Sequence, residues 1–153
     1  MSFFPNQYLD LNFFEIEVDA FTGANYAPLG SILQDTGGVI TASSTEIILP
    51  AGRSYLLKSN IVFVAPNTTF IQGEVKFRDS ITSLDLSNQA VGYVLARPTQ
   101  SGGNFLTGDA FALLLETVTE TRVRFYLSIA TMTVQKNSAT QQIPNSTITI
   151  LYT

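Results

Sequence analysis

Residues 14–20 read FEIEVDA, and this strict alternation of apolar and acidic side chains decides the fold class. Successive side chains of a β-strand point to opposite faces of the sheet, so the apolar residues share one face and the three carboxylates share the other. The segment therefore predicts a half-buried strand, with a core on one side and a carboxylate-lined outer face on the other.

Turn residues separate further segments of the same kind. We expect strands at residues 39–49, 54–64, 70–78, 88–97, 110–118, 121–130 and 147–152. The Pro-Ala-Gly sequence at residues 50–52 is typical of a tight turn, and no window of helical length carries a convincing stripe of period 3.6. The pattern predicts an all-β fold: an antiparallel two-sheet sandwich, or jelly roll, of about eight strands with an extended N-terminal arm.

The N-terminal part of the chain differs from the rest in its aromatic content. Residues 1–26, the arm and the first strand, hold seven of the 17 aromatic side chains, and residues 27–153 make up the predicted jelly-roll domain. We expect Phe3, Phe4, Tyr8 and Phe13 to dock the arm, because burial of one Phe contributes about 1.5–3 kcal/mol. The surface that receives them could be a foreign protein, a sister subunit or the chain's own sandwich.

Two predicted strands, at residues 90–96 and 110–115, are apolar on both faces. A sandwich strand normally shows one face to water, so a second subunit or a covering loop is needed over these two. We expect the subunit, in a homotrimer, and leave the loop as the alternative. The expected interface residues are Tyr93, Leu95, Phe111, Leu113 and Leu115.

The distribution of charge argues against nucleic acid as a partner. The net charge is −4, residues 1–52 contain six acidic and no basic side chains, and the eight basic residues further along are scattered. No basic stripe therefore follows a phosphate backbone. The longest apolar run, residues 110–115, is far shorter than the roughly 20 residues that cross a bilayer, so no membrane partner is expected either.

The absence of histidine and cysteine removes the commonest catalytic and metal-binding groups. Carboxylate chemistry remains, and Glu15, Glu17 and Asp19 lie about 6–7 Å apart along one strand face. We interpret them as a solvated face, with a small carboxylate-dependent hydrolase as a remote alternative. A calcium site formed by Asp79, Asp85 and Asn88 is an alternative, and we expect no catalytic residue, metal or cofactor.

Residues 47–57, read IILPAGRSYLL, resemble the turn between early strands of complement C1q/tumour-necrosis-factor-like jelly rolls, particularly those of bacteriophage structural proteins. The later order of segments is similar too. Gly73 and Phe77 lie on one strand that ends at Asp79, a strand follows at residues 121–129, and a last strand occupies residues 147–152.

This resemblance implies a compact trimer with its N-termini gathered on one side. It implies a virion structural protein, a capsid decoration or cement protein whose partner is the major capsid protein or another virion protein, located on the capsid surface. The alternative is a receptor- or carbohydrate-binding knob of a phage fibre, with loops near Asn67 and Gly102 facing the ligand. The family offers no catalytic residues to carry over.

Overall fold

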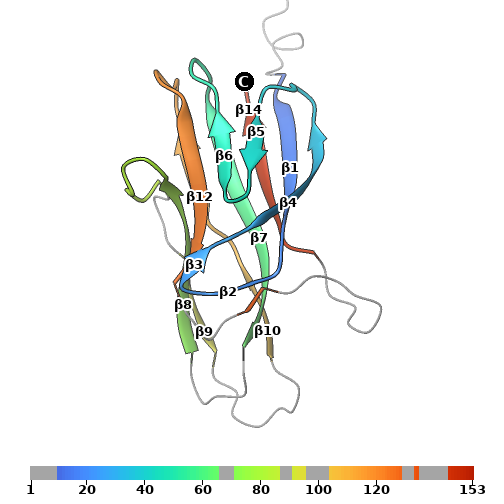
Figure 1. The fold of residues 1–153 in the computed structure, drawn as a ribbon, viewed down its shortest axis with the longest axis vertical. Helices are drawn as coiled ribbons and strands as arrows, with labels where there is room; N and C mark the ends of the chain where they lie inside the picture. The colour runs from blue at the N-terminus through green and yellow to red at the C-terminus, as the bar shows by residue number, and fades with distance from the viewer. Residues whose placement is uncertain (1–9, 66–70, 87–90, 96–103, 129–132, 135–144) are drawn as a thin grey trace, which may run out of the picture.

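The computed structural model describes residues 10–65, 71–86, 91–95, 104–128, 133–134 and 145–153. These residues form two antiparallel β-sheets, which Figure 1 shows as two layers running along the long axis of the molecule. The C-terminus lies at the upper end of this view, and β8, β9 and β10 reach toward the lower end.

The first sheet has eight strands and contains both β1 and β14. Its strands are β1 (Asn12–Val18), β2 (Phe21–Thr22), β4 (Leu29–Asp35), β7 (Tyr55–Ala65), β10 (Asn104–Gly108), β11 (Phe111–Leu114), β13 (Thr133–Val134) and β14 (Thr147–Tyr152). The order across the sheet is β2-β13-β7-β14-β1-β4, and both β10 and β11 also pair with β7. The N-terminal and C-terminal strands of the described chain are therefore direct neighbours.

The second sheet has six strands centred on β12 and β8. Its strands are β3 (Asn25–Tyr26), β5 (Thr41–Ser43), β6 (Glu46–Leu49), β8 (Ile71–Asp79), β9 (Val91–Leu95) and β12 (Thr121–Leu127). The order is β5-β6-β12-β8-β9, with β3 pairing with β12.

The core lies between the two sheets and follows from the alternation in the sequence. In β1, Phe14, Ile16 and Val18 are fully buried and alternate with partly exposed residues. The same pattern occurs in β12 and β14. Phe77 and Phe125 meet edge to face at 5.4 Å between ring centroids, an arrangement that aromatic pairs favour.

The fold class predicted from the sequence is confirmed, although the described chain has fourteen strands instead of about eight. Four of these strands have only two or three residues. β10 and β11 keep one register along β7, with Gly108 opposite Ile61 and Phe111 opposite Lys58, so they form one interrupted strand. No helix that could span a membrane occurs among the residues that the structure describes.

Five strands of the described chain lie outside the expected segments, namely β2, β3, β4, β10 and β13, and β4 is the longest of them. β4 lies at the edge of the first sheet, and its residues 31–34 are exposed. An edge strand with so little burial carries no alternation of apolar and polar side chains, so the period-two pattern could not identify it.

Candidate functional site

Four apolar side chains cross the outer face of the first sheet in one line. Leu113 of β11 pairs with Leu56 of β7, Leu56 pairs with Leu151 of β14, and Leu151 pairs with Phe13 of β1. Directly opposed side chains on neighbouring strands lie about 4.5–5.5 Å apart at Cβ. The four residues therefore form a continuous strip, which we call the apolar row.

The apolar row is open to solvent in the single chain. Leu113 is 50% exposed, Leu56 is 40% exposed, and Leu151 is also exposed. A shallow hollow of about 180 Å³ lies beside the apolar row. It is lined by Leu11, Ser54, Tyr55, Leu56, Leu113, Leu151 and Thr153. A mainly apolar hollow of this kind, next to a row of exposed leucines, is typical of a surface that another protein covers.

The next row along the same strands carries charge. Phe111 pairs with Lys58, Lys58 pairs with Thr149, and Thr149 pairs with Glu15, a set that we call the charged row. The Lys58 ammonium lies 5.6 Å from the centroid of the Phe111 ring, a cation–π contact. Lys58 and Glu15 are both partly exposed. The outer face thus changes from apolar to charged within one strand repeat.

The structure brings three of the five expected interface residues to one region. Phe111 and Leu113 lie on β11 with their side chains exposed, on the face that carries the apolar and charged rows. Leu115 follows directly after β11 and is 69% exposed. Tyr93 and Leu95 lie on β9 of the second sheet, and their side chains lie outside the described residues.

The expected docking arm falls largely outside the described residues. Phe3, Phe4 and Tyr8 all belong to that undescribed part, residues 1–9. Phe13, by contrast, is the second residue of β1 and contributes to the apolar row. The sequence grouped Phe13 with the arm, and the structure places it in the first sheet.

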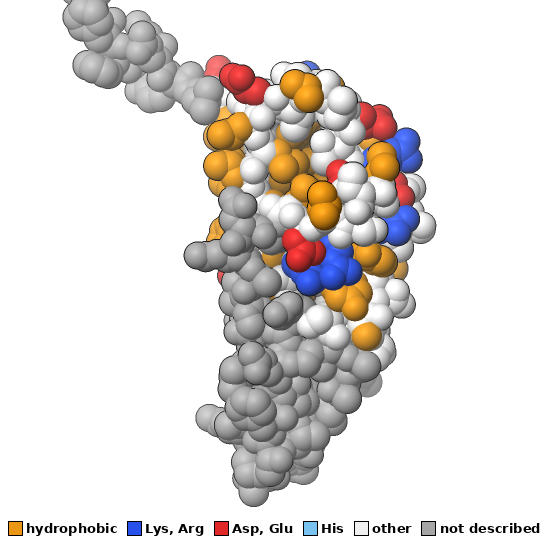
Figure 2. Space-filling model, turned by 90° about the vertical axis from the view of Figure 1, so that its left-hand side faces the viewer, with side chains coloured by type: hydrophobic (Ala, Val, Ile, Leu, Met, Phe, Trp, Pro, Cys, Tyr) orange, Lys and Arg blue, Asp and Glu red, His pale blue; other side chains and the backbone are white. Residues whose placement is uncertain are grey.

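The outer face of the second sheet carries a cluster of charged and aromatic side chains. Its members are Tyr26, Glu46, Lys76, Arg78, Asp85, Glu120, Arg122, Arg124 and Tyr126. Four of the eight basic residues of the chain are among them. Figure 2 shows acidic and basic side chains touching on the side of the molecule where β8 and β12 lie, with hydrophobic side chains around them.

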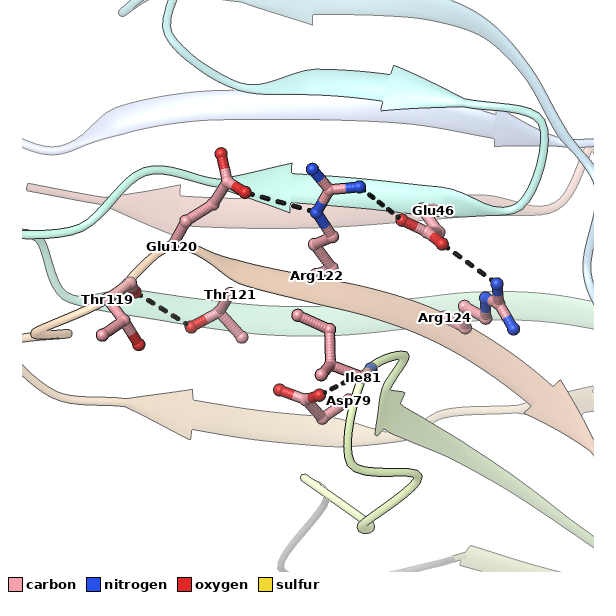
Figure 3. Close-up of polar contacts among 8 residues, drawn as sticks. All are labelled: Glu46, Asp79, Ile81, Thr119, Glu120, Thr121, Arg122 and Arg124. Atoms are coloured by element: carbon pink, nitrogen blue, oxygen red, sulfur yellow. Dashed lines mark hydrogen bonds and ion pairs between the residues drawn. The ribbon is translucent and has the colours of Figure 1, made fainter.

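Internal partners neutralise most of the charge in this cluster. Glu46 accepts from Arg124 at 3.0 Å and lies 3.6 Å from Arg122, which also contacts Glu120 at 3.2 Å (Figure 3). The Arg78 guanidinium stacks 4.2 Å from the centroid of Tyr126. The alternation predicted a polar face here, but cross-strand pairing is not visible in one sequence, so the cluster itself was missed.

Asp79 and Asp85, the two described members of the calcium alternative, are engaged within the chain. Asp79 caps the turn that follows β8 by accepting from the backbone amides of Ile81 and Thr82, both at 2.9 Å. Burial raises the pKa of Asp85, but hydrogen bonds and charge from Arg78 and Lys76 outweigh it and lower that pKa overall. Asn88 lies outside the described residues.

The carboxylates of β1 do not converge with other acidic groups. Glu15 and Glu17 lie on the outer face of the first sheet, and Asp19 follows the end of β1. Within the described part of the chain, no three acidic side chains are grouped so that they could hold a metal ion. A pair of carboxylates across a cleft, which glycosidase chemistry needs, is not formed by these three residues.

A partly buried hydrogen bond joins two strands of the first sheet. Tyr152, fully buried at the end of β14, donates its hydroxyl to the Asp35 carboxylate at 2.5 Å. Burial, and to a smaller extent this hydrogen bond, raise the pKa of Tyr152 to about 12. A side chain at Gly37 would overlap the Tyr152 hydroxyl, so glycine is required at this close approach. The bond ties β14 to the edge strand β4.

Comparison with known proteins identifies the fold. No family model and no curated protein matches the sequence. Among solved structures, Eiger TNF from S. frugiperda is similar, with a TM-score of 0.56, 6% identity and coverage of 94% of this chain and 92% of that one. Murine APRIL at pH 8.5 is similar, with a TM-score of 0.51, 11% identity and coverage of 93% and 98%. The chain therefore has a TNF-like jelly-roll fold.

Proposed function

We propose that this chain is a non-enzymatic structural protein that assembles as a homotrimer through the outer face of its first sheet. The observation that carries the proposal is the apolar row, Leu113-Leu56-Leu151-Phe13, which crosses four neighbouring strands. Exposed apolar strips that are continuous across a sheet mark interaction surfaces.

Covering the apolar row stabilises the assembly through the hydrophobic effect. Complete burial of a leucine contributes about 1.5–3 kcal/mol, so a half-exposed leucine still gains roughly 1 kcal/mol when a partner covers it. Three leucines and one phenylalanine, repeated at each contact of a closed ring, supply a strong apolar contribution to assembly. The resemblance of residues 47–57 to C1q/TNF-like jelly rolls supports three as the number of subunits.

We propose a virion structural protein, a capsid decoration or cement protein on the capsid surface, whose partner is the major capsid protein or another virion protein. The support is the resemblance to bacteriophage jelly rolls and the aromatic arm residues Phe3, Phe4 and Tyr8. Three arms on one rigid body raise the effective concentration of each, so weak single contacts suffice.

The assembly is tested by comparing two exposed leucines. Leu113→Asp places a charge in the apolar row, and Leu84→Asp places one on the loop after β8, where Leu84 is 67% exposed. Light scattering behind a sizing column should give about 50 kDa, three times the 16.7 kDa of the chain, for the wild type and Leu84→Asp. Leu113→Asp should give the monomer mass. A trimer that survives Leu113→Asp contradicts the proposed interface.

The virion placement has its own test. Capsids stripped of this protein should bind the full chain in a sedimentation assay, and a chain starting at Asp10 should trimerise without binding them. Phe3→Ala with Phe4→Ala should weaken binding in the same direction. Equal binding by the truncated and full chains would rule out the arm as the docking element.

A fibre knob that binds a receptor or a glycan is the second candidate. The loops expected near Asn67 and Gly102 lie outside the described residues, and the loop at residues 79–86 favours this alternative. Asp79 holds its turn rigid, while Ile81 is 73% exposed beside the exposed Leu84. Two aliphatic side chains held open on an ordered loop are suited to contact with a partner. Ile81→Ser with Leu84→Ser should abolish attachment to host cells under this alternative and leave capsid binding unchanged under the first.

A further inference from the structure

We infer that the trimer contact is specified by an ion pair between Lys58 of one subunit and Glu15 of the next. This inference rests on the proposed homotrimer and names the polar contact that fixes how neighbouring copies align. It starts from the charged row, where Lys58 lies on β7 and Glu15 on β1 with β14 between them.

Neither side chain has an ion-pair partner among the residues that the structure describes. The other face provides the contrast, since Lys76, Arg78, Arg122 and Arg124 all contact carboxylates of their own chain. Lys58 and Glu15 are two strand spacings apart, about 10 Å, on either side of β14. Lys58 is held there by the Phe111 ring. Within the described part of the chain, the face thus carries two complementary charges that form no ion pair with each other.

Threefold symmetry brings the two halves of this face together. In a cyclic trimer each contact is formed by two different surfaces, so the β7 side of one copy meets the β1 side of the next. A rotation about an axis along the strands leaves the height of a residue unchanged. Lys58 and Glu15 lie in one cross-strand row, so they reach the contact at the same level.

Burial of the apolar row makes this pairing necessary. The charged row is one strand repeat away, so a neighbouring subunit that covers the first row would also lie close to the second. An unpaired charge in a dry contact is strongly unfavourable, whereas two opposite charges that meet there are largely compensated. The apolar row therefore supplies affinity, and the Lys58–Glu15 pair supplies alignment and excludes partners with the wrong charge.

The test exchanges the charges of Lys58 and Glu15 and measures two things: trimer formation and the mixing of subunits with the wild type. Lys58→Glu alone and Glu15→Lys alone place like charges together and should each raise the concentration for half-assembly about tenfold or more. The double variant, Lys58→Glu with Glu15→Lys, should restore the trimer. Isotopically labelled wild type and the double variant should not form mixed trimers, because every mixed contact would join like charges. Native mass spectrometry after mixing and dilution measures this directly.

The control exchange is made at a pair within one chain. Arg122→Glu with Glu120→Arg reverses an ion pair of 3.2 Å on the second sheet, and this variant should mix freely with the wild type. Free mixing of the Lys58/Glu15 double variant, or single variants that assemble like the wild type, would overturn the inference while leaving the trimer intact. A wild type that stays monomeric would instead refute the homotrimer itself. Circular dichroism confirms that each variant is folded.

Discussion

The outer faces of the two sheets differ in the contacts that their exposed side chains make. On the second sheet, Glu46 lies within 3.6 Å of two arginines, and Arg78 stacks on Tyr126. On the first sheet, Leu56 and Leu113 stand open, with Lys58 beside them. Among the described residues, the charged side chains of the second sheet contact one another within the chain, whereas the leucines of the first sheet stay exposed in the single chain. Contacts within the same chain therefore distinguish the solvated face of the second sheet from the face that we propose as the interface.

Removing the core beneath both faces should have the largest effect on stability. Phe125→Ala deletes a buried ring of β12 that packs on Phe77, and such changes cost about 3–5 kcal/mol. Urea unfolding should show the lower free energy of unfolding, and the assembly should weaken along with it. An assembly that persists after the core is lost would mean that the outer face does not depend on the sandwich that positions it.

Removal of the Tyr152–Asp35 hydrogen bond should affect the first sheet alone. Tyr152→Phe removes the hydroxyl that donates a hydrogen bond to Asp35. This change should lower the free energy of unfolding by about 1–3 kcal/mol. Because the protein raises the pKa of Tyr152 from 10.0 to about 12, the protonated phenol stabilises the fold. This contribution is fully present below the unfolded pKa and is lost as pH rises through the folded pKa.

The corresponding measurement compares the wild type and Tyr152→Phe in urea at about pH 8 and about pH 12. The difference between their free energies of unfolding should shrink at the higher pH, because the wild type loses its advantage there. A difference that stays constant or grows would show that the pKa of Tyr152 is not raised in the folded protein.

The charged cluster of the second sheet should give the smallest effect. Glu46→Gln removes the carboxylate shared by Arg122 and Arg124, and partly exposed pairs of this kind contribute about 0–1 kcal/mol. The mass of the assembly should not change. If Glu46→Gln dissociated the trimer, this face would belong to the interface, and the contrast between the two sheets would fail.

Alternation in the sequence predicted the fold class because burial in β1, β12 and β14 follows it residue by residue. The expected interface residues Phe111 and Leu113 are exposed on β11, and their segment of the sequence is apolar on both faces. Alternation could not assemble the apolar row, because Leu56, Leu151 and Leu113 come from three strands distant in sequence and only register brings them together. The Tyr152–Asp35 bond likewise joins residues 117 positions apart.

Thiol accessibility tests the contrast between the faces most directly. The chain has no cysteine, so Leu113→Cys and Leu84→Cys each introduce a single thiol at a position that is exposed in the isolated chain. We predict that maleimide modifies the Leu84→Cys thiol rapidly at any protein concentration. The Leu113→Cys thiol should react about tenfold or more slowly when the protein is concentrated, and rapidly once it is diluted and dissociates. Equal, rapid modification of both thiols in concentrated protein would contradict the account.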